Sequence, residues 1–296
     1  MKSPGYWQAL KKTVTEFLDD NALRLSAALA YYSVFSLAPL LLIAIALAGA
    51  VFGETAVRGQ LDDQLKGSLG ASGALAVQDM VAHARKPEHN ALMSAAGVVM
   101  LLFGAGGVFG QLKDALNAVW GVETKPGRGL KGLLKDRFLS FSMVLGTGFL
   151  LLTSMILTTV LQATSTWVGN IAHLPTQLWT AVSAVGSFAL VSLLFAAIFK
   201  VLPDAKVQWR HVWVGAVFTA ALFVAGKFGI AWYLGRESTS SSYGTAGSLA
   251  LVLLWVYYSA IILLFGAEFT QVWANSHGEE IEPDADAQKA GEPLKP

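Results

Sequence analysis

The sequence predicts an all-α fold: a polytopic membrane protein with six transmembrane helices and additional interfacial helices. Of its 296 residues, 54% are hydrophobic and only 14% are charged, and the mean hydropathy is +0.52. Soluble proteins average about 45–50% apolar and about 25% charged residues, so this chain has roughly half the usual charge. Six apolar stretches are also long enough to cross a hydrocarbon core, which takes about 20 helical residues.

We place the six spans near residues 31–52, 91–110, 138–161, 178–199, 212–234 and 248–270. The third and fourth spans come from one uncharged run, 138–199, which is too long for a single helix. Gly169-Asn170 and Pro175 interrupt this run and predict a hairpin. The first run could instead be a signal peptide, because residues 48–50 resemble a cleavage site. Its length and the five spans that follow it favour a retained helix.

Residues 1–30 are predicted to hold a cytoplasmic interfacial helix followed by the start of the first span. Trp7, Leu10, Val14 and Phe17 recur at helical spacing, with charged residues between them. This pattern is typical of a helix that lies in the plane of the membrane interface. The same apolar face could instead pack against the protein's own bundle, and the two arrangements are compatible.

Three segments outside the spans differ in length and charge. Residues 53–90 form the longest connection, and their helical spacing predicts a periplasmic cap. Residues 111–137 carry six Lys or Arg and predict a basic cytoplasmic loop that binds anionic lipid headgroups. A basic loop could also serve only to set the topology. Residues 271–296 are acidic, contain three prolines and predict a disordered cytoplasmic tail.

The distribution of basic residues predicts that both termini are cytoplasmic. The amino-terminal piece, 111–137, 200–211 and the tail hold four, six, three and two Lys or Arg. The alternate segments 53–90, 162–177 and 235–247 hold four, none and one. Cytoplasmic loops carry the excess of Lys and Arg, so the first set is expected to face the cytoplasm.

Two charged residues lie within the predicted spans. Charges in a span are costly, so each suggests a functional role. Glu268 is expected near the inner boundary, where the available cations are Arg24 and Lys200, with Arg137 or Arg210 as further candidates. Lys227 is expected in the outer half, at the depth of Trp255 and Tyr257, and should not pair with Glu268. Both charges also have structural explanations, because Lys227 could extend toward the interface and Glu268 could cap an inner-face network.

Small and bendable residues are concentrated in the first two spans. Gly106 and Gly110 have the GxxxG spacing that lets helices approach closely. Packing alone would explain this spacing, but it also suits a helix that bends around a substrate. Pro39 and Tyr32 give the first span a bendable, polar character.

The sequence shows no signature of an enzyme. It has no cysteine, and its five histidines form no HExxH motif and no i,i+4 pair. It contains no P-loop and no GxSxG motif. We therefore expect no catalytic residues, no metal and no cofactor. The net charge of +1 argues against a nucleic-acid partner, which would call for a strongly basic surface.

Four segments carry a resemblance to a known family: residues 21–39, 111–122, 201–215 and 243–268. In these segments the chain resembles the YihY/BrkB family of bacterial inner-membrane proteins, formerly labelled ribonuclease BN. The resemblance implies a multi-pass protein of the inner membrane with six helices and both ends inside. It implies no settled activity, and the absence of nuclease motifs here is consistent with a mistaken ribonuclease label.

The positions that match the family carry no assigned catalytic role. They include Asp114, Asn117, Trp120, Gly121, Pro203, Gly215, Tyr243, Gly244, Trp255 and Gly266, together with Arg24, Tyr31, Tyr32, Pro39 and Glu268. Pro203 joins Pro39, Gly106 and Gly110 as a position of helix bending or close packing.

The leading functional hypothesis is a transporter or flippase for a lipid, an envelope precursor or a small solute. The residues expected along its pathway are Glu268, Arg24, Lys227, Lys200, Tyr32 and Tyr257. A cation/proton exchanger is the alternative, because a single membrane carboxylate can exchange a proton for a metal ion. A membrane scaffold that supports envelope integrity without transport is the third hypothesis. Membrane lipids are the expected partners, and a homo-oligomer stays open.

Overall fold

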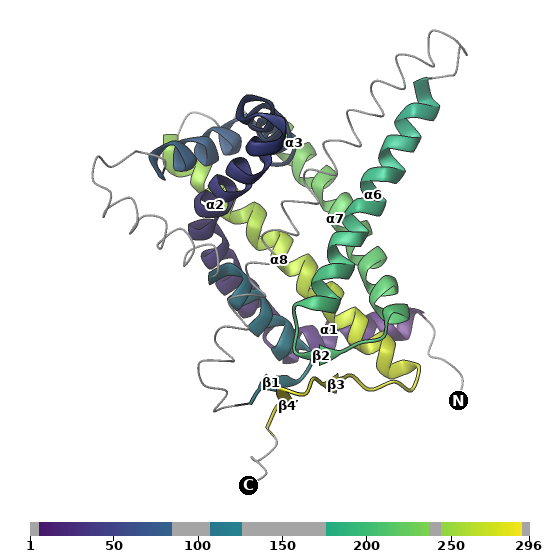
Figure 1. Ribbon diagram of the computed structural model, residues 1–296. Helices are drawn as coiled ribbons and strands as arrows, with labels where there is room; N and C mark the ends of the chain where they lie inside the picture. The colour runs from purple at the N-terminus through teal and green to yellow at the C-terminus, as the bar shows by residue number, and fades with distance from the viewer. Residues whose placement is uncertain (1–5, 85–106, 126–175, 237–243, 292–296) are drawn as a thin grey trace.

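The computed structural model describes residues 6–84, 107–125, 176–236 and 244–291 (Figure 1). The helices are α1 (Tyr6–Asp19), α2 (Ala22–Phe52), α3 (Glu54–Ala84), α6 (Thr176–Val201), α7 (Trp209–Arg236) and α8 (Gly244–Ser276). Residues 107–119 form a further helical segment. The strands are β1 (Val122–Thr124), β2 (Ala205–Lys206), β3 (Glu282–Pro283) and β4 (Ala287–Lys289). The described chain is thus predominantly helical.

Four helices in the described residues are long and apolar enough to cross a membrane. The qualifying stretches are Ala22–Ala46, Ala184–Val201, Trp209–Gly229 and Leu249–Ser276. They match the first, fourth, fifth and sixth predicted spans. Most of the predicted span 91–110 and all of 138–161 lie outside the described residues. The helix of the first span, α2, begins at Ala22, directly after the turn at Asn21, and not near residue 31.

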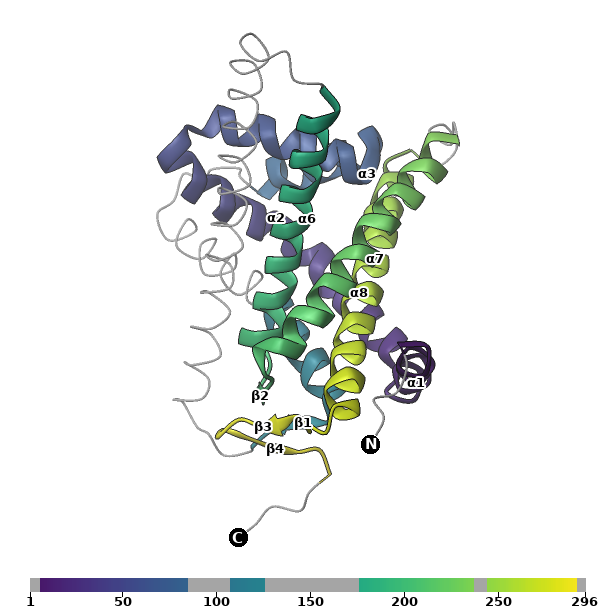
Figure 2. The same cartoon turned by 90° about the vertical axis from the view of Figure 1, so that its right-hand side faces the viewer.

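The two ends of the bundle are built differently. We call the end that carries α1 and all four strands the strand end; α3 lies crosswise at the opposite end (Figures 1 and 2). α1 runs sideways in Figure 1 and is seen end-on in Figure 2, so its axis crosses the bundle. α3 turns at Gly70, whose φ of 71° and ψ of 176° are conformations that glycine adopts without steric cost.

α1 is amphipathic, as its sequence predicts, but its apolar residues divide between two environments. Ala9 and Phe17 are buried against the bundle, and Phe17 contacts Phe265 of α8 edge-on at 5.5 Å between ring centroids. Trp7, Val14 and Leu18 remain exposed. The helix therefore packs on the protein with one face and offers apolar side chains to its surroundings with another.

The main core lies where the helical segment 107–119, α6, α7 and α8 meet. Trp120, Phe199 and Phe195 form a chain of ring contacts, with centroids 6.2 Å apart at each step. Phe195 also contacts Phe223 of α7 at 5.9 Å. Aromatic residues bury large areas and favour these tilted geometries, so this chain of rings connects the helical segment 107–119 to α6 and α7.

α7 and α8 approach each other closely at two glycines. The side chain of Thr270 lies over Gly215, and that of Thr219 lies over Gly266, so a methyl group on either glycine would overlap a threonine oxygen. Each threonine hydroxyl donates to a carbonyl of its own helix, Thr219 to Gly215 and Thr270 to Gly266, both at 2.7 Å. The two helices thus pack through a reciprocal Gly–Thr contact of the kind that favours close helix pairing in membranes.

The residues after α8 contact two loops at the strand end. β4 pairs with β1 and β3 pairs with β2, both antiparallel. We call residues 279–291 the C-terminal strap. The structure differs here from the sequence prediction of a disordered tail from residue 271, since 271–276 continue α8 and the strap contains two strands. Strand pairing with loops distant in sequence outweighs the polar composition of this segment.

Replacing Gly266 with alanine should destabilise the protein, because the new methyl group collides with Thr219. Overpacking of this kind costs about 1–3 kcal/mol, so the melting temperature of the purified protein in detergent should fall by several degrees. Gly229→Ala is the matched control on α7, since nothing in the described chain lies within 4 Å of the position that its new methyl group would take. Equal melting temperatures for the two variants would contradict the packing described above.

Candidate functional site

Glu268 is fully buried near the strand end of α8, within a candidate span. Neither of its carboxyl oxygens has a hydrogen-bond partner. The preceding residue is held in place, because Trp120 Nε1 donates to the Ala267 carbonyl at 3.0 Å. Burying an ionised carboxylate without a partner is strongly unfavourable, so this residue requires a proton or a ligand.

Asp20 and Glu16 are the charged residues that act on Glu268. Glu16 lies on the last turns of α1, and Asp20 follows the helix directly. Asn21 then adopts a left-handed conformation, with φ 54° and ψ 35°, which asparagine tolerates better than most residues. This turn leads the chain from the crosswise α1 into α2, and the Asp20 carboxyl interacts with that of Glu268.

The three carboxyl groups have little compensating positive charge. Lys12 lies 3.2 Å from Glu16 Oε1, but Glu16 Oε2 is buried without a partner. Partial burial raises the pKa of the Asp20 carboxyl, the interaction with Glu268 opposes that rise, and the Glu16 and Asp19 carboxylates add to it. We call Glu16, Asp20 and Glu268 the carboxyl cluster. In the described part of the chain, no set of three or more side chains has the arrangement of a metal site.

A second polar cluster, buried and fully paired, lies close to the strands. Lys113 Nζ lies 2.9 Å from Asp204 Oδ2, and both side chains are less than a tenth exposed. Asn117 accepts a hydrogen bond from the Asp204 backbone N–H at 2.9 Å and donates to its carboxylate at 3.3 Å. Thr124 donates to the same carboxylate at 2.8 Å. These contacts connect the helical segment 107–119 and β1 to the turn between α6 and α7.

The same contacts set the ionisation of Asp204, which lies outside the candidate spans. Burial acts to raise its pKa, but hydrogen bonds from Lys113, Thr124 and Asn117 outweigh it and hold the pKa below its ordinary value. Asp204 is therefore a carboxylate near neutral pH. This cluster is a structural connection, because every charge in it is compensated.

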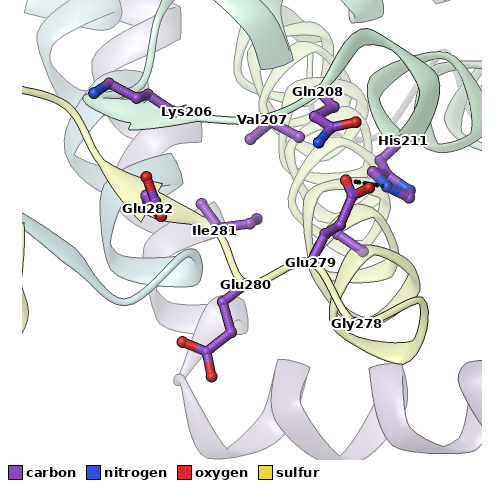
Figure 3. A pocket seen from close by; sticks show the side chains of 10 residues that line it. Lys206, Val207, Gln208, His211, Gly278, Glu279, Glu280, Ile281 and Glu282 are labelled. Atoms are coloured by element: carbon purple, nitrogen blue, oxygen red, sulfur yellow. Dashed lines mark hydrogen bonds and ion pairs between the residues drawn. The ribbon is translucent and has the colours of Figure 1, made fainter.

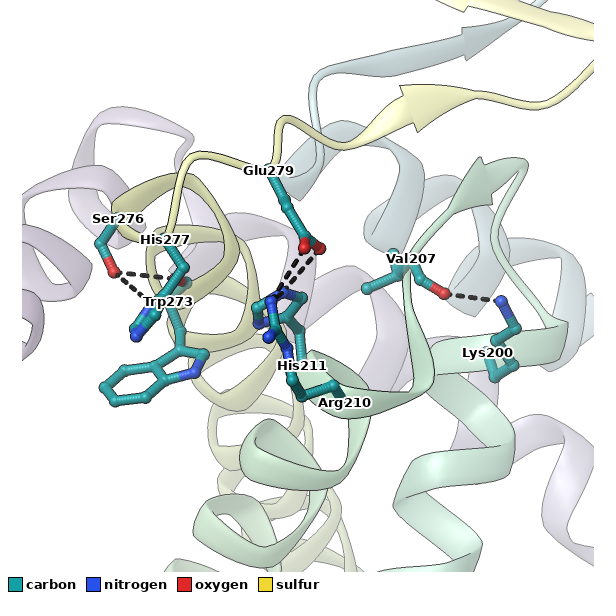
Figure 4. A network of polar contacts seen from close by, with 8 residues as sticks. All are labelled: Lys200, Val207, Arg210, His211, Trp273, Ser276, His277 and Glu279. Carbon is teal, nitrogen blue, oxygen red and sulfur yellow. Dashed lines mark hydrogen bonds and ion pairs between the residues drawn. The ribbon is translucent and has the colours of Figure 1, made fainter. Parts of the chain in front are cut away.

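The C-terminal strap forms a third polar cluster with the start of α7. Glu279 lies between Arg210 and His211, with its two oxygens 2.8 Å from Arg210 Nη2 and His211 Nε2 (Figure 4). A cavity of about 570 Å³ lies beside these residues, between the segment 206–211 and the first residues of the strap (Figure 3). Its polar lining residues are Lys206, Gln208, His211, Glu279, Glu280 and Glu282. Their charges are of both signs and partly paired.

Further contacts fasten the strap to both loops. The backbone N–H of Asp284 donates to the Asp204 carbonyl at 2.8 Å, and that of Ala290 donates to the Gly121 carbonyl at 2.8 Å. Lys125 Nζ donates to the Ala285 carbonyl at 3.0 Å. The strap therefore holds the loop after residue 119 and the α6–α7 turn in one closed arrangement.

The structure does not gather the predicted pathway residues around one site. Arg24 is exposed on α2, and the charged neighbours of Glu268 are acidic. Lys227 is exposed on α7, and within the described residues no ion pair or ring contact involves it. Lys200 Nζ donates to the Val207 carbonyl at 2.6 Å (Figure 4). It also lies 5.8 Å from the centre of the Trp209 ring. Tyr32 is half-exposed and Tyr257 is half-buried, each on a separate helix.

The residues expected to bend or pack helices lie in several parts of the structure. Pro39 lies inside α2, and buried Pro203 follows the end of α6 in the turn that contains Asp204. Gly106 lies outside the described residues. A methyl group on Gly110 would meet no atom within 4 Å in the described chain, where close helix approach is found at Gly215 and Gly266.

The family-like positions mostly have packing or positioning roles. Asn117 orients Asp204, Trp120 binds α8, and Gly266 contacts Thr219. Trp255 packs edge-on against Phe223 at 5.9 Å. Asp114 is exposed, Gly244 begins α8, and Tyr243 lies outside the described residues.

Sequence analysis missed Asp20 and Glu16 as neighbours of Glu268. The Asp-Asn pair at 20–21 is a turn signal, but only the packing of α1 on α8 brings the turn to that carboxyl. It also treated Lys113 as part of a basic lipid-binding loop. In the structure Lys113 is paired with Asp204, and Lys125 contacts the strap; the other basic residues of 111–137 lie outside the described part.

Comparisons with known proteins place the chain among bacterial membrane proteins. A family model described as "Virulence factor BrkB" matches residues 13–291. The chain is 29% identical over 266 residues to a UPF0761 membrane protein of Methylibium petroleiphilum, covering 88% of this chain and 61% of that protein. It is 28% identical over 251 residues to one of Ralstonia nicotianae, covering 84% and 55% respectively.

These relatives are longer than this chain, which spans less than two thirds of their length. No solved structure matches it. The match over residues 13–291 includes all three polar clusters, so the carboxyl cluster, the Lys113–Asp204 cluster and the strap all lie within the family's common region.

Replacing Lys113 with methionine should destabilise the protein strongly, because it leaves the Asp204 carboxylate buried without its cation. Breaking one side of a buried pair costs about 3–5 kcal/mol, so the melting temperature in detergent should fall sharply. Arg58→Met is the matched control, since its ion pair with Glu54 at 2.8 Å is exposed and such pairs contribute about 0–1 kcal/mol.

The loss of stability caused by Lys113→Met should become smaller as the pH falls. Asp204 has a lowered pKa, so the stability it contributes is present above the pKa of an unfolded aspartate, about 4, and is lost as pH falls through the lowered value. The difference in melting temperature between wild type and variant should be full near pH 7 and shrink below about pH 4. A difference that stays constant down to about pH 3 would contradict this assignment.

Replacing Glu279 with alanine should loosen the strap, because it removes the partner of both Arg210 and His211. Trypsin should then cleave after Lys206 and after Lys289 of β4 several times faster in membrane fragments open on both sides, as measured by mass spectrometry of the peptides. Glu282→Ala is the control, since this exposed side chain makes no ion pair within the described residues. Unchanged cleavage in Glu279→Ala would show that the strap is held by its strands alone.

Proposed function

Because the chain belongs to the BrkB family of integral membrane proteins, we propose that it transports a lipid, an envelope precursor or a small solute across a bacterial inner membrane. In this proposal the chain crosses the membrane six times, and the strand end faces the cytoplasm. The excess of Lys and Arg in the segments assigned to that side supports this orientation.

The observation that carries the proposal is Glu268. A fully buried carboxyl group without a hydrogen-bond partner contributes nothing to the stability of the fold and costs free energy to bury. Ionisable groups inside membrane spans typically mark pathways for ions, protons or substrates. A purely structural protein would have no use for such a group at this position.

The surroundings of Glu268 suit a gate at the cytoplasmic end. The strap and the Lys113–Asp204 cluster close the loops at this end, and Trp120 connects the closed loops directly to the residue before Glu268. Protonation or ligand binding at Glu268 would therefore act next to the contacts that hold the loops together. Transporters that expose a site to alternate sides need a link of this kind.

A cation/proton exchanger is the second candidate, and the carboxyl cluster favours it specifically. Glu16, Asp20 and Glu268 together carry more negative charge than Lys12 compensates. Such a group of carboxyls attracts either protons or cations. The exchanger and the lipid or solute transporter predict different transported species, so one reconstitution distinguishes them.

The test uses the purified protein in proteoliposomes with two parallel readouts. Fluorescent phospholipid accessible to dithionite from one side measures lipid movement, and an internal pH dye measures proton movement driven by imposed sodium or potassium gradients. We expect at least one activity, and we expect Glu268→Gln to abolish it, because glutamine cannot exchange a proton. Glu54→Gln, an exposed glutamate outside the candidate spans, should leave it unchanged.

Movement of phospholipid without proton flux would favour the flippase, and cation-driven proton flux would favour the exchanger. Equal activity in wild type and Glu268→Gln would overturn the assigned role of this residue. Neither lipid nor ion movement, together with stoichiometric copurified proteins, would favour the scaffold hypothesis.

A further inference from the structure

We propose that Asp20 and Glu268 form a carboxyl pair that shares one proton, with Asp20 relaying it between buried Glu268 and water at the strand end. This inference rests on the proposed function, since the shared proton would be the ion that drives transport. It assigns a role to the turn between α1 and α2, which the proposed function itself does not require.

Asp20 and Glu268 each lie three residues after the Phe17–Phe265 ring contact that packs α1 on α8, and their carboxyl groups interact. Neither oxygen of Glu268 meets a donor in hydrogen-bond geometry. Two ionised carboxylates repel each other at such a position, whereas a carboxylic acid beside a carboxylate supplies the missing donor. A single proton therefore satisfies both groups and leaves the pair with one negative charge.

The charged groups around Asp20 and Glu268 are mainly acidic. Glu16 on α1 is the other charged group that acts on Glu268, and Lys12 pairs with Glu16 on its exposed side. Arg24 on α2 is exposed, and the segment 107–119 leads to Trp120, which is uncharged and donates to a backbone carbonyl. The charged groups facing the pair are thus mainly negative, which favours retention of a proton.

The carboxyl pair suits a proton better than a metal ion. A bound metal requires several ligand atoms that converge at short distances. No set of three or more acidic or histidine side chains in the described chain provides that arrangement. A proton needs only the two facing carboxyl groups, which the structure provides.

The positions of the two residues suggest a direction of transfer. Glu268 is fully buried, whereas Asp20 is exposed in part at the strand end. In the transfer, the O–H bond of Glu268 breaks as an O–H bond forms on Asp20, and Asp20 then releases the proton to water. The charge of the pair changes only in this last step, when a proton leaves for the solvent.

The test is labelling of the whole protein in lipid vesicles with dicyclohexylcarbodiimide, which reacts with protonated carboxyls in apolar surroundings. Mass spectrometry should find the adduct on Glu268 near pH 7, and Glu268→Gln should lack it. In Asp20→Asn the neighbouring negative charge is gone while Glu268 stays buried, so on raising the pH its labelling should be lost about one pH unit earlier than in the wild type. Asp19→Asn, which changes the adjacent exposed carboxyl, is the matched control and should label as wild type does.

Infrared spectroscopy is the second readout, because it does not require a reagent to reach Glu268. The infrared band of a protonated carboxyl should be present in the wild type and absent from Glu268→Gln. Equal pH dependence of the labelling and of this band in wild type and Asp20→Asn would overturn the shared proton, and protection of Glu268 by sodium or potassium would show that the site binds a metal cation instead. If the labelling pattern holds while the liposomes show no transport, the proposed function fails and the proton pair stands.

Discussion

The arrangement at the strand end depends on one constraint: a carboxyl group buried in a membrane span must receive a proton or a cation. Glu268 is buried on every side, since α1 packs over it through Phe17 and Phe265, and Trp120 binds the carbonyl before it. The only charged side chains that act on it in the described chain are carboxylates. The fold thus encloses a group whose ionisation state is coupled to the packing of three separate segments.

Two kinds of contact close the strand end: tightly packed contacts that form a framework, and weaker contacts that hold the strap. The Gly–Thr contacts between α7 and α8 and the Lys113–Asp204 cluster are fully packed or fully paired, and they fix the framework. The strap is joined by short strands and by Glu279, which is only partly buried. Such lightly buried pairs separate at lower cost than the core does, so the strap is the part of the closed end best suited to open.

The long apolar helices could be predicted from the sequence, whereas the strap and the neighbours of Glu268 could not. The apolar stretches near 178–199, 212–234 and 248–270 predicted α6, α7 and α8 closely, because a long uncharged run has few alternatives to a spanning helix. The strap was missed, since two- and three-residue strands carry no periodicity and an acidic composition favours disorder when no partner is visible. Glu268 was recognised from its charge, but its expected partner Arg24 proved to be exposed.

The sequence by itself determined the membrane-spanning class of the protein, the positions of its described spans and the identity of its one fully buried acid among the described residues. These follow from local hydrophobicity, which each stretch of chain carries independently of the rest. Only the tertiary structure decided that Asp20 and Glu16 face Glu268, that Lys113 pairs with Asp204 and that the tail joins two loops. Each of these contacts connects residues far apart in the chain, and it arises from how α1, α8 and the loops pack together, which no local pattern encodes.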